Sequence, residues 1–336
     1  MNILVLGGTQ FSGRAFVELA VQNNHQVTVL HRSKADPGLP PAVRRLVGDR
    51  DPKVGDGLDH IQALLDAGER FDAVVDMCGY NPRVTKAACD LLNDHTDLYI
   101  FISTISVYDQ SATSGTISED DPKIILDDPT VEEVTGETYG GLKVLCEQVV
   151  TDAFPNNHCI PRPCVIAGPN DPTDRVTWWA RMLTTQDQLV IPKAENNYYA
   201  SLIDARDLAA FFLHCAVNKV IGIYNATGPE PDFALSDFIQ QSHAALSSKT
   251  TLIEAETEWI EAQGVKRWLD IPVWLPDAAQ HIHRIDSSKA RAAGLTNRPL
   301  EDTMRAIHQW DIARGSPDLK AGMKPERACS LGEIMQ

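Results

Sequence analysis

The chain has 336 residues, of which 43% are hydrophobic, and a formal net charge of −16 at pH 7. This length allows one large domain plus a smaller lobe, and the acidic balance disfavours nucleic acid as a partner because it repels the phosphate backbone. No apolar run approaches the roughly eighteen residues that indicate a membrane span. Because Met1 leads directly into an apolar run and the seven cysteines are scattered without a C-x-x-C pair, we expect a cytoplasmic protein with reduced thiols.

Residues 1–32 predict a strand, a glycine-rich turn, a helix and a second strand. The first strand, from Asn2 to Leu6, is apolar without alternation, as in a parallel sheet buried on both faces, and Gln26 to Leu30 repeats this pattern. Between the strands, Gly7 allows a sharp turn and Gly13 lets the helix pack closely on it. The first helical amides then point at an anion, most simply a pyrophosphate. Taken alone, the same pattern also fits a tight turn without a ligand.

The residues after the second strand, His31 and Arg32, bear on which nucleotide is bound. An NAD site usually places a carboxylate here for the ribose 2′-hydroxyl, whereas a guanidinium group matches a 2′-phosphate. We therefore expect NADP in preference to NAD. The alternative, that Arg32 is solvated or stacks on adenine without selecting a cofactor, stays open.

Strands and helices then alternate along the chain. A third strand is expected at Arg44–Val47, a fourth at Phe71–Met77 and a fifth within Asp94–Ile105, with helices near residues 58–67 and 83–93. This alternation predicts an α/β fold with a doubly wound parallel sheet. After the third strand, Asp49 either binds an adenine amino group or forms an acidic turn or helix N-cap.

A long acidic connection, residues 106–138, precedes a helix that begins at Tyr139. Such a length is typical of an active-site wall. Tyr139 and Lys143 are four residues apart, so both side chains lie on one helix face. An ammonium group near a phenol favours the phenolate and lowers a pKa that is ordinarily about 10. We therefore expect Tyr139 to exchange protons near neutrality.

With the glycine turn, the segment Ser103–Tyr108 after the fifth strand and Tyr139-x-x-x-Lys143 in this order, the chain resembles the extended (atypical) short-chain dehydrogenases/reductases. Within them it is similar to the NAD-dependent epimerase/dehydratase family. The resemblance continues in Arg162-Pro163 and in residues 168–172, 203–209 and 286–290, so it covers about residues 1 to 310. It implies a Rossmann NAD(P)-binding domain of residues 1–165 and 201–228. Residues 166–200 and 229–336 would form a smaller mixed α/β substrate lobe and the C-terminal tail.

The resemblance also implies residue roles. Tyr139 would be the acid/base, Lys143 the ribose ligand that tunes it, and Thr104 the hydroxyl that binds the reacting oxygen, with Ser103 as the neighbouring candidate. Alternatively, Thr104 is a strand residue with a satisfied hydroxyl. The nicotinamide carries the hydride chemistry, and the protein supplies orientation and the proton. The residues expected to contact the cofactor are Gly7, Thr9, Gln10, Phe11, Gly13, Arg32, Asp49, Cys78, Tyr139 and Lys143.

Departures from the family pattern bear on the substrate. Sugar-nucleotide members usually have an arginine where this chain has residues 197–201, NYYAS, and sugar epimerases have a histidine and two alanines where it has residues 76–80, DMCGY. Together with Gln10 in place of a glycine, this looks more like the bacterial isoflavone-reductase-like branch. We therefore expect hydride transfer to or from a carbonyl or secondary alcohol of a small, apolar or aromatic substrate. Two alternatives stay open: a catalytically silent nucleotide sensor, and a sugar-nucleotide epimerase or dehydratase that holds pyrophosphate through Arg175, Arg181 or Arg206.

Aromatic side chains are concentrated in the predicted lobe, where they form either its core or a wall for a flat, apolar ligand. Asp174 and Arg175 either bind a polar substituent or form an N-cap and a solvated first turn. His281 and His283 are expected on a half-exposed strand, and because the ten histidines show no metal spacing we assign no metal. The expected partner is a small molecule, not nucleic acid or a membrane, and the chain is expected to be a monomer or a homodimer. The aromatic residues are Trp178, Trp179, Tyr198, Tyr199, Trp259, Trp268 and Trp274.

Overall fold

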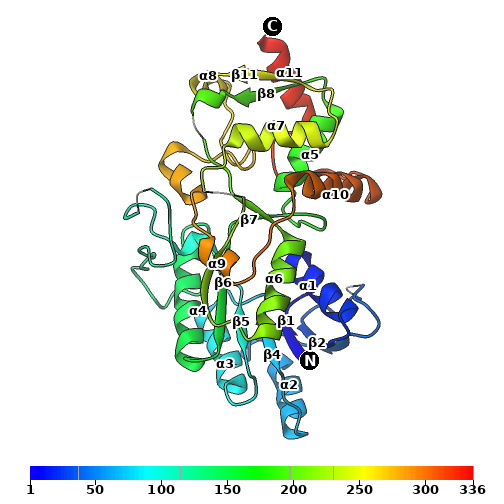
Figure 1. The fold of residues 1–336 in the computed structure, drawn as a ribbon, viewed down its shortest axis with the longest axis vertical. Helices are drawn as coiled ribbons and strands as arrows, with labels where there is room; N and C mark the ends of the chain where they lie inside the picture. The colour runs from blue at the N-terminus through cyan, green and yellow to red at the C-terminus, as the bar shows by residue number, and fades with distance from the viewer. Residues whose placement is uncertain (37, 114, 197, 230, 336) are drawn as a thin grey trace. The chain divides into compact units, whose positions relative to one another are not determined.

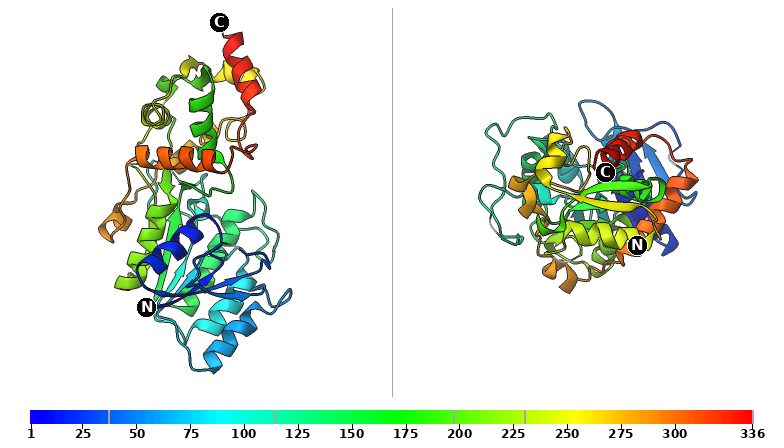
Figure 2. Two further views of the ribbon diagram at one scale, coloured as in Figure 1. Left: turned by 90° about the vertical axis from the view of Figure 1, so that its right-hand side faces the viewer. Right: turned by 90° about the horizontal axis from the view of Figure 1, so that it is seen from above.

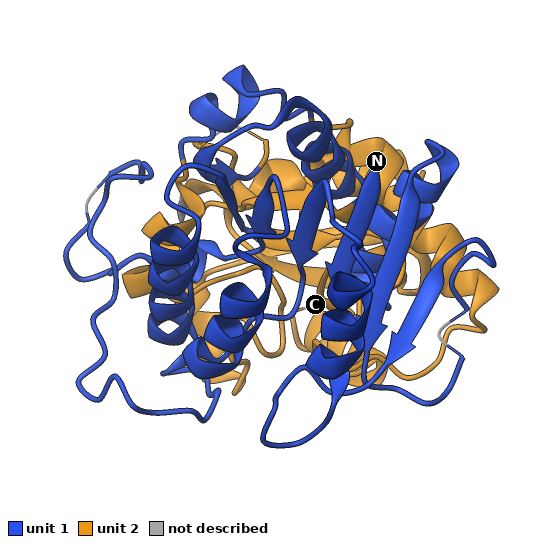
Figure 3. Cartoon of the chain, turned by 90° about the horizontal axis from the view of Figure 1, so that it is seen from below, with its two compact units in different colours: residues 1–164, 206–227, 286–296 blue, residues 165–205, 228–285, 297–336 orange. Residues whose placement is uncertain are grey.

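The computed structural model (Figure 1) describes residues 1–36, 38–113, 115–196, 198–229 and 231–335. The chain divides into two compact units, which Figure 3 shows in different colours. Unit 1 comprises residues 1–164, 206–227 and 286–296, and unit 2 comprises residues 165–205, 228–285 and 297–336. Across the described ranges, every helix is too short or too polar to span a bilayer.

Unit 1 is built on a seven-stranded sheet in which all strand pairs are parallel, in the order β10-β6-β5-β4-β1-β2-β3. This confirms the predicted doubly wound sheet. The order reverses between β1 and β4, and in such sheets ligands bind in the crevice at the carboxyl ends of the strands at this point. The strands are β1 (Asn2–Leu6), β2 (Gln26–His31), β3 (Arg44–Val47), β4 (Ala73–Asp76), β5 (Tyr99–Phe101), β6 (His158–Pro163) and β10 (Gly222–Ala226).

Helices cover both faces of this sheet (Figure 2). On one face lie α1 (Phe11–Gln22) and α6 (Ala205–Asn218), where the rings of Phe16 and Phe212 are 6.5 Å apart. On the other lie α2 (Gly57–Asp66), α3 (Pro82–Leu92) and α4 (Tyr139–Ala153), which share a core with the strands. Burial on both faces explains why the central strands β1 and β4 are apolar without alternation.

The boundaries between the units differ from the expected ones. Residues 165, 201–205 and 228, expected in the Rossmann domain, belong to unit 2. The reason is that β9 (Leu202–Asp204) pairs with β7 (Val165–Ala167) in a separate two-stranded sheet. Residues 286–296, expected in the lobe, belong to unit 1, where α9 (Ser288–Ala292) packs against β10. Residues 206–227 rejoin unit 1 as expected.

Unit 2 combines the β7/β9 pair with a second parallel pair, β8 (Gln188–Pro192) and β11 (Thr251–Ala255). Trp178, Trp179 and Trp274 are almost completely buried in its core, and the rings of Trp178 and Trp179 meet edge to face at 5.0 Å. These three tryptophans are therefore core residues and do not form a ligand wall. The helices of unit 2 are α5 (Arg175–Thr185), α7 (Leu235–Ala245), α8 (Thr257–Ala262), α10 (Leu300–Ala313) and α11 (Pro325–Ile334).

The strand expected at His281 and His283 is instead a 3₁₀ helix, η3 (Asp277–His283). With three residues per turn, this helix turns the two histidines to different faces. His283 is buried, and its Nδ1 lies 2.8 Å from the Ser201 hydroxyl oxygen. Burial lowers the pKa of His283 to about 4, so its imidazole is neutral at pH 7.

Candidate active site

The glycine turn follows β1 in unit 1 and has the backbone conformation that the sequence predicts. Gly7 has a φ of +95°, a region that favours glycine. At Gly13, an added Cβ would lie 2.8 Å from the Cα of Gly8, so only glycine lets α1 approach the turn so closely. Gln10 occupies the N-cap position without a side-chain cap hydrogen bond, and Phe11 begins α1 with a φ of +46°. The N-terminus of α1 therefore presents uncapped amides that suit an anion.

A buried ion pair that the sequence did not predict lies at the end of β4, next to this turn. Arg50 donates two hydrogen bonds to the carboxylate of Asp76, at 2.5 and 2.8 Å. The Tyr99 hydroxyl and the Cys78 amide donate to the same carboxylate at 2.9 and 3.1 Å. Burial alone would raise the pKa of Asp76, but Arg50 outweighs this effect and holds the pKa below its usual value. Cys78 adjoins the turn, since its Sγ would lie 3.2 Å from a Cβ added at Gly7.

Tyr139 and Thr104 come together at the carboxyl end of β5. Tyr139 is the first residue of α4, and the Thr104 side chain lies close enough to it to lower its pKa. Thr104 Oγ1 also donates to Ser106 Oγ at 3.2 Å and accepts the Ser106 amide at 3.1 Å. Ser103 does not join this group, because its Oγ is buried without a hydrogen-bond partner in the described part of the chain. The geometry therefore favours Thr104 over Ser103.

Lys143 lies one turn further along α4, yet the pKa of Tyr139 is raised, not lowered as the spacing predicted. Burial causes the rise, and the Thr104 side chain offsets it only in part. The Lys143 ammonium donates to the carbonyl oxygens of Gly79 at 2.9 Å and Ile102 at 2.5 Å. An ammonium group has three donors, so one remains for another acceptor. Burial also lowers the pKa of Lys143 itself.

Two further residues that were expected at the cofactor lie at the carboxyl ends of neighbouring strands. Arg32 is exposed directly after β2. Asp49 follows β3, and its carboxylate accepts the Asp51 amide at 2.9 Å, which is the geometry of an acidic turn. The N-cap position of α2 belongs to Asp56, so the N-cap alternative for Asp49 is wrong.

Tyr80 is a neighbour of the site that the sequence marked only as part of a departure from sugar epimerases. Its ring centre lies 6.3 Å from that of Tyr139 and 5.2 Å from the Lys143 Nζ. Burial raises the pKa of Tyr80 to about 12. A second phenol thus lies beside Tyr139, but Thr104 affects the pKa of Tyr139 and not that of Tyr80.

Three residues of unit 2 were candidates for contacting a substrate, and each has a different side-chain partner in the structure. Arg181 is held by Asp311 at 2.7 Å, whereas Arg175 lies over the Trp268 ring at 5.0 Å. Asp174 is buried with a φ of +58°, forms no cap hydrogen bond and accepts from Arg314 at 2.7 Å, so its role is structural. Position 197 lies outside the described residues.

The sequence model of the NAD dependent epimerase/dehydratase family matches residues 3–226. The match includes the glycine turn, Thr104, Tyr139 and Lys143. The chain belongs to this family.

The chain is also similar in sequence to a plant protein and in fold to solved structures. The chain is 26% identical over 244 residues to the chloroplast stem-loop binding protein of 41 kDa b of Arabidopsis thaliana, a match that covers 68% of this chain and 58% of that protein. This chain therefore matches less than two thirds of that relative's length. In fold it is similar to UDP-glucuronic acid 4-epimerase from Bacillus cereus in complex with NAD, with a TM-score of 0.65, 19% identity and coverage of 93% and 99% of the two chains. It is also similar to the human epimerase family protein SDR39U1 (isoform 2) with NADPH, with a TM-score of 0.59, 18% identity and coverage of 92% and 99%.

Proposed function

We propose that the chain is an NAD(P)-dependent oxidoreductase that transfers a hydride between the nicotinamide and a carbonyl or secondary alcohol carbon of a small, apolar or aromatic substrate. The observation that carries this proposal is the grouping of Tyr139 and Lys143 on α4 with Thr104 beside Tyr139. These three residues lie in the same unit as the glycine turn, at the edge of the sheet where doubly wound folds bind ligands.

The residues of unit 1 fit a dinucleotide. The close approach at Gly13 leaves no room for a side chain between α1 and the turn, and the N-terminus of α1 has no side-chain cap, which suits a pyrophosphate. The unused donor of Lys143 suits a ribose hydroxyl. When bound, the nicotinamide supplies or accepts the hydride.

The protein groups then handle the proton. In reduction, the substrate carbonyl oxygen gains negative charge and takes the proton of the Tyr139 hydroxyl, while Thr104 orients that oxygen. The pKa of Tyr139 is raised by burial, so this phenol carries a proton at neutral pH that it can donate. Net reduction is favoured over epimerisation because the arginine that usually anchors a sugar nucleotide is missing.

NADP is proposed in preference to NAD. Arg32 is exposed immediately after β2, and a guanidinium group pairs with phosphate through charged hydrogen bonds. The nearby carboxylate of Asp36 is already paired with Arg45 at 2.6 Å. The two similar structures were solved with NAD in one case and NADPH in the other, so they do not favour either cofactor.

A sugar-nucleotide epimerase or dehydratase is the second candidate, favoured by the family description and by the similarity to a UDP-glucuronic acid 4-epimerase. Against it, the arginine usual before the I-D-x-x-D-L-A segment is missing. Arg181 does not replace it, because Asp311 and the Pro317 carbonyl occupy its guanidinium group.

The experiment that separates these candidates incubates the chain with NADPH and a panel of aromatic ketones and sugar nucleotides, while the absorbance of the reduced cofactor is followed. We expect one NADPH to be consumed for each ketone reduced. An isomerised sugar nucleotide with no net change in the cofactor would support the epimerase instead. If no panel compound changes and the chain only binds cofactor, the proposal of an enzyme is wrong and a nucleotide sensor replaces it.

RNA binding is not proposed, although the name of the Arabidopsis relative refers to stem-loop binding. The net charge of −16 opposes association with a phosphate backbone. We further propose that the chain is cytoplasmic and that it is a monomer or a homodimer.

A further inference from the structure

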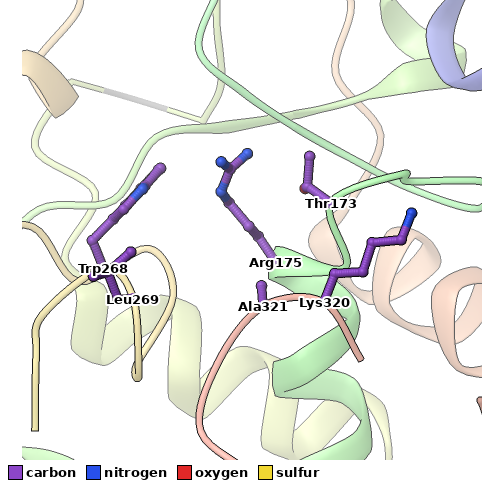
Figure 4. Close-up of a pocket in the computed structure, with 6 residues that line it drawn as sticks. All are labelled: Thr173, Arg175, Trp268, Leu269, Lys320 and Ala321. Atoms are coloured by element: carbon purple, nitrogen blue, oxygen red, sulfur yellow. The ribbon is translucent and has the colours of Figure 1, made fainter. Parts of the chain in front are cut away.

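A pocket of about 280 Å³ lies within unit 2 (Figure 4). This volume is slightly below the range of drug-sized ligand sites, so it suits a small molecule or one end of a larger one. Its walls come from the start of α5, from the segment before residue 270, and from the segment between α10 and α11. The residues that line it are Thr173, Arg175, Trp268, Leu269, Lys320 and Ala321.

Hydrogen bonds connect the three segments that form the walls of the pocket. The Asp174 carboxylate at the start of α5 accepts from the Arg314 side chain at 2.7 Å and from the Lys320 amide at 3.2 Å. The Leu269 carbonyl accepts the Gly322 amide at 3.1 Å. The segment after α10 is therefore tied to both other walls, and the pocket is formed before any ligand binds.

Among the residues that the structure describes, those lining the pocket include two cations and no carboxylate. Figure 4 shows the Arg175 guanidinium group directed into the space between Trp268 and Thr173. Two carboxylates lie next to the lining, and one oxygen of Asp171 is buried without a hydrogen-bond partner among the described residues. Asp174 is bound to Arg314, and the other oxygen of Asp171 accepts both the amide and the hydroxyl of Thr173, at 2.8 and 2.7 Å. Neither carboxylate forms an ion pair with Arg175 among the described residues.

These groups select for a particular chemistry. Lys320 uses one of its three donors on the Pro172 carbonyl at 3.0 Å, which leaves two, and the guanidinium of Arg175 presents a planar fork of donors. Both match an oxyanion. The ring of Trp268, 5.0 Å from the Arg175 Cζ, supplies a flat apolar surface beside the cation.

We propose that this pocket binds the carboxylate or phosphate group of a small ligand that also carries a flat ring. Arg175 and Lys320 neutralise the anion, and Trp268 contacts the ring. Binding here is independent of the proposed hydride transfer, because the pocket lies wholly within unit 2 and is measured without cofactor.

The test is isothermal titration calorimetry on the full chain without cofactor, with phenyl phosphate, benzoate and benzyl alcohol as probes. We expect at least one of the two anions to bind, more weakly as salt is added, and the neutral alcohol not to bind. Arg175→Gln should weaken anion binding by about tenfold or more, and Arg175→Lys by less. Lys320→Gln should also weaken it. Lys249→Gln, which removes an exposed cation that does not line the pocket, should change nothing.

Circular dichroism of each variant checks that it folds, and Lys320→Gln tests the pocket without altering α5 if Arg175→Gln does not fold. A preference for benzoate or phenyl phosphate identifies the anion as carboxylate or phosphate and supports the proposal. Failure of both anions to bind would overturn it, and so would equal binding of benzyl alcohol. Equal losses in Lys249→Gln and Arg175→Gln would show that only overall charge matters, which also overturns it.

Discussion

Tyr139 is held in its protonated form by burial, which raises the pKa of its hydroxyl. A protonated phenol gives its proton to an oxygen that gains negative charge, so it serves reduction directly. In the oxidation direction the same group must first lose its proton, so that direction should become faster as the pH rises.

Arg32 carries the prediction about cofactor choice. Replacing Arg32 with alanine should weaken NADPH binding by roughly 10- to 100-fold and NADH binding much less, since a charged hydrogen bond to the 2′-phosphate is lost. The measurement is the dissociation constant of each reduced cofactor by fluorescence titration.

Arg44→Ala is the matched control for Arg32→Ala, because it removes the same charge from an exposed arginine. Arg44 lies at the first residue of β3 and pairs with Glu69 at 2.7 Å, away from the carboxyl ends of the strands. The control should leave both dissociation constants unchanged. Equal losses of NADPH and NADH affinity in Arg32→Ala would contradict the preference for NADP.

At the scale of elements, the Arg50–Asp76 pair ties the segment after β3 to the end of β4, next to the glycine turn. Asp76 is fully buried and accepts four hydrogen bonds, two of them from Arg50. Asp76→Asn should lower the free energy of unfolding by about 3–5 kcal/mol, because it leaves the charge of Arg50 buried without a counterion. Urea unfolding followed by circular dichroism measures this loss.

Asp90→Asn on α3 is the control for Asp76→Asn. Asp90 pairs with Lys86 at 2.7 Å, but both side chains are more than half exposed, and such pairs contribute little to stability. This variant should unfold at nearly the wild-type urea concentration. If Asp76→Asn is equally stable, the buried pair does not hold the strand ends together.

The buried strands β1, β2 and β4 could be predicted from sequence because each is a local apolar run. The bounds of β3, Arg44–Val47, also match the prediction residue for residue. The Arg50–Asp76 pair could not, since its partners are 26 residues apart and meet only when the carboxyl ends of β3 and β4 come to one edge. The spacing of Tyr139 and Lys143 predicted a shared helix face, but the sign of the Tyr139 pKa shift depends on burial, which the spacing does not reveal. The true boundaries of the units depend on β9, whose pairing with β7 no local pattern indicates.

At the scale of the whole molecule, the net charge of −16 sets an expectation for partners. We predict that the chain does not bind a stem-loop RNA at physiological salt, because a strongly acidic protein is repelled by the phosphate backbone. Fluorescence anisotropy of a labelled stem-loop RNA measures this. Tight binding that weakens steeply as salt is added would contradict the prediction and would extend the property in the Arabidopsis relative's name to this chain.

The catalytic role of Tyr139 is tested most directly by comparing Tyr139→Phe with Tyr80→Phe on a ketone that the wild-type chain reduces. Each variant removes the hydroxyl from one of two neighbouring rings, whose centres are 6.3 Å apart. Tyr139→Phe should lower the rate of NADPH consumption by roughly 10²–10⁴-fold while cofactor binding stays nearly unchanged, because only the proton donor is lost. Tyr80→Phe should stay close to the wild-type rate. A fully active Tyr139→Phe enzyme would contradict the assignment of Tyr139 as the acid/base.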